Sequence, residues 1–148
     1  MRHVTAALLL AVALSPVCAQ TMVEDIAPSH IEGNVPATQD FERLLIRDLT
    51  AFFAARTGKV VRIEYRLLRD GPTQSGIAFP KYYAWVKVFD GNALIDDGAV
   101  RLAAIERKRF EITDFVSSDT ARANRSAVEA VFPPPLVPGI LASAGARI

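Results

Sequence analysis

The sequence predicts an α+β domain in which one long helix packs on a four-stranded antiparallel meander sheet, with a short helix near the C-terminus. Apolar residues recur at spacings of three and four over residues 41–57, and they alternate with polar residues in several later segments. No helical pattern separates those later segments. Because parallel strands need a long crossover connection, consecutive strands joined by short turns are expected to pair antiparallel.

The first 19 residues have the parts of a secretory signal peptide. Arg2 precedes an apolar block at residues 4–14, and small residues surround a cleavage point after Ala19. The block is shorter than the roughly 20 apolar residues that span a bilayer. We therefore expect an exported protein, periplasmic or secreted, without a membrane span. The alternative is a lipid anchor at Cys18, which Val17 disfavours because a small residue is expected before a lipidated cysteine.

Cleavage after Ala19 would leave a mature chain without cysteine and with balanced charge. The chain has 17 Lys and Arg against 16 Asp and Glu, and Arg2 accounts for the difference. A neutral balance predicts no long-range attraction to nucleic acid. Stability must then come from a packed core rather than from disulfides.

An N-terminal arm and a long helix come first in the mature chain. Residues 20–37 mix acids, glycine and proline without a sustained period, which indicates an arm. In the helix, Thr38 is the expected N-cap, Asp40 lies in the first turn, Arg56 lies near the last, and Gly58 is the expected C-cap. The apolar stripe that should lie across a sheet contains Phe41, Leu45, Leu49, Phe52 and Phe53.

Four strands are expected after Gly58, at residues 59–70, 81–89, 98–105 and 109–116. The third is preceded by an optional extension with a bulge at Asp97 and Gly98. On the fourth, Asp114 interrupts the apolar side that Phe110, Ile112 and Val116 form. We expect Asp114 to bond backbone groups or to cap the next turn.

The C-terminal part predicts a short helix, capped by Ser118 or Asp119, that ends before three prolines at residues 133–135. The domain would then cover residues 38–132. The Pro-rich tail, residues 133–148, is apolar enough either to fold back onto the domain or to contact a partner.

One long helix followed by four antiparallel strands resembles the cystatin-like superfamily over roughly residues 38–116. The resemblance implies the fold. It does not imply protease inhibition, because the loop residues Gln74, Ser75 and Gly76 depart from the inhibitory Gln-x-Val-x-Gly pattern and the later Pro-Trp pair is missing.

Few residues of the mature chain suit catalysis. His30 is its one histidine, so a Ser-His-Asp triad has little basis, and no nucleophile elbow is present. Asp96 and Asp97 lack an EF-hand frame, and no glycine-rich phosphate loop occurs. We expect no catalytic residues, no metal and no cofactor, and a binding protein rather than an enzyme.

The candidate binding site is the polar face of the sheet. Strand alternation places seven candidate residues opposite the apolar core: Arg62, Arg66, Tyr83, Trp85, Lys87, Arg101 and Arg109. Arginines bind acidic groups bidentately and the aromatic rings stack. In the alternative interpretation, Glu64 and Glu111 pair with these arginines across strands and the rings cover the arginine stems.

These patterns favour an exported, non-enzymatic binding or assembly module that recognises a protein or an acidic ligand through that face. One alternative is an NTF2-like ligand-binding protein or enzyme with a pocket between helix and sheet, suggested by Asp114 and Tyr65 on the core side. Another is a protease inhibitor acting through residues 73–80. The identity of the ligand and the oligomeric state are not predicted.

Overall fold

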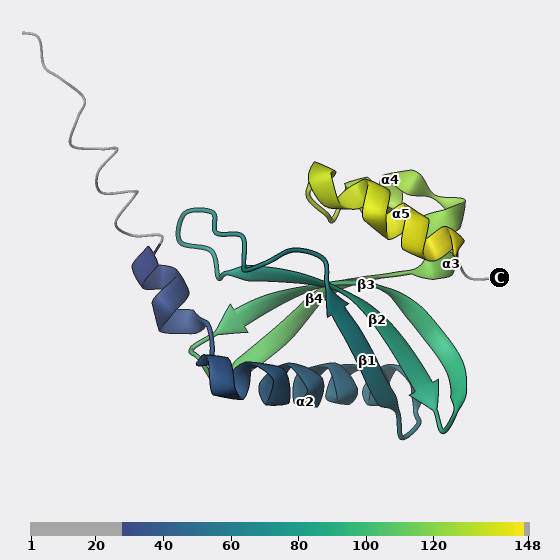
Figure 1. Ribbon diagram of the computed structural model, residues 1–148, viewed down its shortest axis with the longest axis horizontal. Helices are drawn as coiled ribbons and strands as arrows, with labels where there is room; N and C mark the ends of the chain where they lie inside the picture. Colours follow the sequence, from purple (N-terminus) through teal and green to yellow (C-terminus); the bar gives the residue numbers. More distant parts are fainter. Residues whose placement is uncertain (1–27, 147–148) are drawn as a thin grey trace, which may run out of the picture.

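The computed structural model describes residues 28–146, so the predicted signal peptide, Cys18 and residues 20–27 of the arm lie outside the described residues. The elements follow in the order α2 (Thr38–Thr57), β1 (Arg62–Leu67), β2 (Lys81–Asp90), β3 (Ala93–Ile105), β4 (Arg109–Ser117), α3 (Ser118–Ala123), α4 (Arg125–Glu129), η1 (Pro134–Leu136) and α5 (Val137–Gly145). The four strands pair antiparallel in the order β1-β2-β3-β4, which confirms the predicted fold class. Figure 1 shows α2 along one face of the sheet and α3, α4 and α5 over the other.

Helix α2 has the predicted extent but not the predicted N-cap. Thr38 is the first helical residue, so Ala37 occupies the N-cap position, and alanine has no side-chain group that could accept a hydrogen bond there. Asp40 in the first turn and Arg56 in the last complement the helix dipole. Gly58 ends the helix with a φ of +69°, and its amide donates to the Ala54 carbonyl.

The part of the predicted arm that the structure describes is ordered against the sheet. Residues 28–34 are helical rather than extended. The buried Asn34 side chain accepts from the Glu106 amide at 3.0 Å and donates to the His30 carbonyl at 2.8 Å. The Asn34 carbonyl also accepts from the Arg107 amide at 2.8 Å. The segment before α2 is therefore hydrogen-bonded to the turn between β3 and β4.

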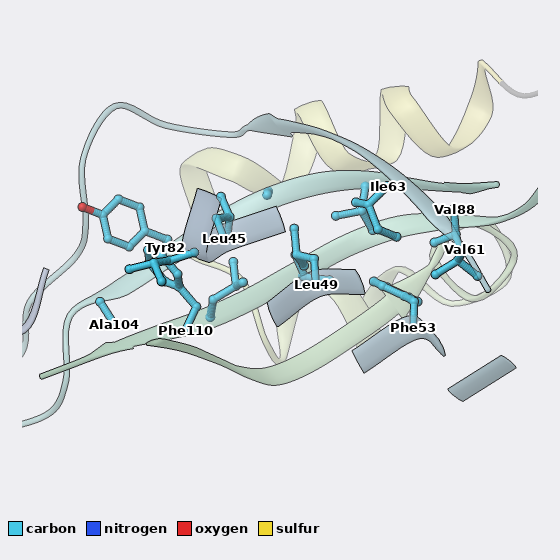
Figure 2. Close-up of a cluster of buried hydrophobic side chains, with 14 residues drawn as sticks. Leu45, Leu49, Phe53, Val61, Ile63, Tyr82, Val88, Ala104 and Phe110 are labelled. Carbon is cyan, nitrogen blue, oxygen red and sulfur yellow. The ribbon is translucent and has the colours of Figure 1, made fainter. Parts of the chain in front are cut away.

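The first core lies between α2 and the sheet, as the apolar stripe predicts (Figure 2). Its buried members are Leu44, Leu45, Leu49, Phe53, Val61, Ile63, Tyr82, Ala84, Val86, Val88, Val100, Leu102, Ala104 and Phe110. Phe41 and Phe52 pack at its margin. Each large side chain buried there contributes on the order of 1.5 to 3 kcal/mol to folding.

A second core covers most of the face that was expected to be polar. Its sheet residues are Tyr83, Trp85, Ala99 and Val116, and its residues from the C-terminal segment are Ala121, Val128, Phe132, Val137, Ile140 and Ala144. After the prolines the chain returns as η1 and α5, so the tail folds back onto the domain. The predicted short helix is divided into α3 and α4 at Asn124, which has an extended backbone.

Two bulges shift the side-chain alternation, one in β3 and one in β4. The first lies at Ile95 on β3, not at Asp97 and Gly98, because Val88 pairs with Asp96 and Phe89 with Leu94. The second lies at Thr113 on β4. Since Arg101 pairs with Asp114 and Leu102 with Ile112, Thr113 is the extra residue.

The bulge at Thr113 corrects the expectation that Asp114 and Val116 lie on the α2 side. An extra residue reverses every later side chain of a strand. Asp114 therefore faces Arg101 on the opposite side, and Val116 belongs to the second core.

Candidate functional site

The seven predicted binding residues do not form one exposed surface. Tyr83 and Trp85 are only 5% and 6% exposed, because the second core covers them. The expectation that these two rings face solvent is therefore wrong. The two rings are buried because apolar residues of the returning tail pack over the middle of the face that was expected to be polar.

Three of the predicted arginines form ion pairs with acidic residues, and two of these pairs, those of Arg62 and Arg109, are similar. Arg62 Nη1 lies 2.5 Å from Glu64 Oε1, and Arg109 Nη1 lies 3.1 Å from Glu111 Oε2. Both pairs join residues of one strand, not of neighbouring strands as the alternative interpretation expected. The Arg62 guanidinium also lies 4.2 Å from the centre of the Phe89 ring, so it forms a cation–π contact as well as the ion pair.

Arg101 joins the sheet to the helical layer. Its Nη2 and Nε atoms lie 2.6 and 2.7 Å from Asp114 Oδ2, and its Nη1 donates to the Val131 carbonyl at 3.4 Å. The Arg101 side chain is 32% exposed. The ion pair joins β3 to β4, and the hydrogen bond to Val131 holds the chain after α4 against β3, so Arg101 has a structural role.

Arg66 and Lys87 are exposed to solvent, and they lie beside two adjacent depressions at the edge of the second core. One depression, of about 230 Å³, is lined by Glu64, Tyr65, Arg66, Trp85 and Lys87. The other, of about 200 Å³, is lined by Trp85, Lys87, Leu94, Asp97, Ser143 and Ala146. Trp85 and Lys87 belong to both. We call the two together the β1–β2 groove.

Strand register positions the groove. Lys87 pairs with Glu64 on one side and with Asp97 on the other, so one row of alternating charge crosses three strands. Arg66 pairs with Trp85 in the next row on the same face. Directly opposite residues of antiparallel strands point to the same side of a sheet, so both rows face the helical layer.

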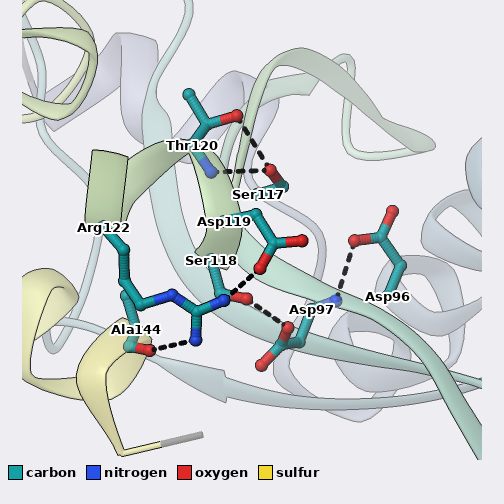
Figure 3. Close-up of polar contacts among 8 residues, drawn as sticks. All are labelled: Asp96, Asp97, Ser117, Ser118, Asp119, Thr120, Arg122 and Ala144. Atoms are coloured by element: carbon teal, nitrogen blue, oxygen red, sulfur yellow. Dashed lines mark hydrogen bonds and ion pairs between the residues drawn. The ribbon is translucent and has the colours of Figure 1, made fainter. Parts of the chain in front are cut away.

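Helix α5 forms the wall of the groove. Ser143 accepts a hydrogen bond from Arg66 Nη2 at 3.2 Å and donates to the Gly139 carbonyl at 2.9 Å. The end of α5 is held by Arg122, which donates to the Ala144 carbonyl at 3.3 Å and pairs with Asp119 (Figure 3). The wall is therefore tied to α3 as well as to β1.

The carboxylates Glu64 and Asp97 of the groove have charged or hydrogen-bonding partners, whereas its two cations have no carboxylate partner among the described residues. Glu64 pairs with Arg62, and Asp97 accepts a 2.6 Å hydrogen bond from the fully buried Ser118 hydroxyl (Figure 3). Among residues 28–146, Lys87 forms no ion pair and Arg66 bonds only the Ser143 hydroxyl. The geometry leaves two cations available to an anion.

Sequence reasoning identified Arg66, Trp85 and Lys87 but missed Ser143, Leu94 and Ala146. Leu94 comes from the extension of β3, which the sequence predicts only as an optional part of that strand. Ser143 and Ala146 come from the tail, whose position depends on packing. The apolar composition of residues 136–144 was the available signal that a helix covers part of the face.

The other two hypotheses depend on other parts of the molecule. The space between α2 and the sheet is filled by side chains with no exposed area, including Leu45, Leu49 and Leu102. Asp114, which motivated a pocket there, lies on the opposite face. In the loop at residues 73–80, Ile77 is 88% exposed, and the Gln74 amide donates to the Gly76 and Ala78 carbonyls. Protease inhibition by this loop stays a prediction.

Residues 28–146 contain no group of three or more histidine, aspartate and glutamate side chains arranged to hold a metal ion. No helix in the same range is long and apolar enough to cross a membrane. Comparison of the chain with protein-family models, with curated proteins and with solved structures finds no match.

Proposed function

We propose that this chain is an exported, non-enzymatic binding module whose β1–β2 groove holds an acidic group of a small ligand or of a partner protein. The observation that carries the proposal is the pair of cations, Arg66 and Lys87, beside the edge of Trp85. Neither has a carboxylate partner in the described chain, and the two carboxylates beside them are engaged elsewhere.

The spacing of the cations suits a carboxylate or a phosphate. Arg66 lies opposite Trp85, and Lys87 is two residues further along β2, which makes the two cations diagonal neighbours. Diagonal neighbours on one face have Cα atoms roughly 7 to 8 Å apart, and both side chains are long enough to meet one anion between them. The Arg66 guanidinium provides two parallel donors, and Lys87 a third.

The size of the groove limits what enters it. Depressions of about 230 and 200 Å³ are smaller than the roughly 300 to 1,000 Å³ of sites that enclose a drug-sized ligand. The groove therefore accepts one acidic group, with the remainder of the ligand outside. A small polycarboxylate and an acidic side chain of a protein meet this condition equally.

A titration followed by tryptophan fluorescence tests the proposal, because Trp85 is the one tryptophan of the chain and lines both depressions. Citrate, inorganic phosphate and a hexaglutamate peptide serve as probes and separate small anions from peptides. We expect saturable binding of at least one probe. We expect Arg66→Ala with Lys87→Ala to weaken it at least tenfold, because each charge-assisted bond contributes about 1.5 to 3 kcal/mol.

The matched control removes two cations elsewhere. Arg43→Ala with Lys59→Ala makes the same change in net charge, and both residues are exposed and paired, with Asp40 and Asp90 respectively. The control should bind within a factor of about three of the wild type. An equal loss in both double variants would indicate a nonspecific charge effect, and no saturable binding of any probe would contradict the proposal.

A further inference from the structure

The two outer edges of the sheet differ in how well they are protected. An edge strand presents unpaired amides and carbonyls that can pair with another chain, and proteins usually block such edges. On β4, the Phe110 amide donates to Asp48 Oδ2 of α2 at 2.7 Å, and Arg47 of α2 donates to the Lys108 carbonyl at 3.0 Å. The bulge at Thr113 further disrupts this edge. Strand β4 is therefore a poor template for pairing.

Strand β1 has none of these protections. Its six residues pair with β2 in an unbroken register, without a bulge or a proline. Among the described residues, no backbone or side-chain group of another element makes a hydrogen bond to the backbone of Ile63, Tyr65 or Leu67.

The register identifies which backbone groups of β1 face outward. The Leu68 amide donates to the Tyr83 carbonyl at 2.9 Å, so these two residues form a hydrogen-bonded pair. In an antiparallel ladder such pairs alternate with non-hydrogen-bonded pairs. Arg62, Glu64 and Arg66 consequently bond to β2. The amides and carbonyls of Ile63, Tyr65 and Leu67 point to the open edge.

Apolar side chains lie along the α2 side of this edge. Tyr65 and Leu67 are only partly buried in the first core. Burial raises the pKa of Tyr65, and the negative charge of Glu42 on α2 raises it further. Ile46, one turn after Glu42 on the same side of α2, is 37% exposed.

The other side of this edge carries two basic residues and one acidic residue of β1. Arg62, Glu64 and Arg66 face that side, and Arg62 pairs with Glu64. Arg66 has no carboxylate partner among the described residues. A segment bound here meets positive charge on one side and apolar surface on the other.

We propose that β1 binds an extended segment of a partner protein as a fifth strand, and that this segment alternates acidic with apolar side chains. Its backbone would pair with Ile63, Tyr65 and Leu67, its acidic side chains would face Arg66, and its apolar side chains would cover Tyr65, Leu67 and Ile46. Strand addition takes affinity from the backbone and specificity from alternate side chains. The proposal goes beyond the groove, because it requires no anion between Arg66 and Lys87.

Amide hydrogen exchange of the full chain tests the proposal, with the peptide Glu-Val-Glu-Val-Glu-Val-Glu as the probe. At saturation we expect exchange at Ile63, Tyr65 and Leu67 to slow at least tenfold. A peptide with lysine in place of each glutamate should give no protection. Absence of protection with the acidic peptide, or protection on β4 in place of β1, would overturn the proposal.

A variant pair separates the backbone from the side chain. Tyr65→Pro removes an outward amide, whereas Tyr65→Val removes the ring and keeps that amide. Because an edge strand tolerates proline where its amide faces solvent, both variants should fold. We expect the valine variant to bind the peptide within about threefold of the wild type, and the proline variant to lose binding at least tenfold. Equal binding by the two would contradict strand addition, and the exchange measurement decides even if the proline variant does not fold.

Failure of this proposal is distinguishable from failure of the groove. The Arg66→Ala with Lys87→Ala variant keeps all three outward amides. If the groove alone binds acidic groups, the peptide changes Trp85 fluorescence without protecting β1. That result would overturn strand addition and leave the groove proposal intact.

Discussion

Gly98 shows how one residue allows two strands to approach closely. A Cβ atom at this position would lie 2.3 Å from the Val116 carbonyl oxygen, 2.8 Å from the Phe115 ring and 2.8 Å from Ser117 Cα. The contact lies just after the bulge, where Phe115 packs against the first core and Val116 enters the second. Since two of the three near atoms belong to the backbone, a side chain here cannot be accommodated by a change of rotamer.

We expect Gly98→Ala to lower the free energy of unfolding by about 3 kcal/mol or more, at the upper end for overpacking. Gly139→Ala in α5 is the control, because a Cβ there meets no atom within 4 Å and alanine favours the helix. The control should be neutral or stabilise by up to about 1 kcal/mol. Urea unfolding measures both, and a Gly98→Ala protein as stable as the wild type would contradict the close approach.

The turn between β3 and β4 is the element with the strained backbone. Glu106 and Arg107 have φ values of 52° and 61°, a region that residues with a side chain rarely adopt. Asn34 accepts hydrogen bonds from both of their amides, with its side chain for Glu106 and its carbonyl for Arg107. The helical segment before α2 thus compensates for an unfavourable turn sequence.

We expect Arg107→Gly to stabilise the protein by about 0.5 to 1 kcal/mol, because glycine adopts a positive φ without a steric cost. Lys108→Gly is the control, since it also removes one charge from the turn but φ is not positive at residue 108. The control should destabilise the protein slightly, because glycine adds freedom to the unfolded chain. Thermal unfolding of the two variants under one buffer checks the expectation, which a destabilised Arg107→Gly would refute.

An element could be predicted from the sequence when the residues that specify it lie within the element itself. Helix α2 was predictable because its stripe, its dipole charges and Gly58 all lie within one segment. The bulge at Thr113 has no local signal, since Phe110, Ile112 and Val116 fit an unbroken alternation. The bulge follows from packing, as it directs Phe115 to one core and Val116 to the other.

At the scale of the whole molecule, the sheet lies between two apolar layers. Residues 82–86 of β2 are all buried, with Tyr82, Ala84 and Val86 in the first core and Tyr83 and Trp85 in the second. A strand covered on both faces is a nearly continuous apolar run, a pattern typical of buried strands. The aromatic run at residues 82–85 therefore reflects burial more than ligand binding. The second core covers the middle of the predicted binding face, so the candidate site is the exposed part around Arg66 and Lys87.

Because both layers share β2 and β3, we expect the molecule to unfold in a single step. Leu49→Ala empties part of the first core and Ile140→Ala part of the second, and both side chains are fully buried. Each should lower the free energy of unfolding by about 2 to 5 kcal/mol. Ile77→Ala is the control, because the Ile77 side chain is 88% exposed, and it should change stability by less than about 0.5 kcal/mol.

The decisive measurement compares two signals during urea unfolding of these variants. Far-ultraviolet circular dichroism follows the whole sheet and all the helices, whereas Trp85 fluorescence follows the contact of the sheet with α5. If the layers are coupled through the shared strands, the two transitions coincide in every variant. If Trp85 becomes exposed at a lower urea concentration than the sheet unfolds in Ile140→Ala, the C-terminal layer detaches by itself. In that case the β1–β2 groove, whose wall is α5, is the least stable part of the molecule.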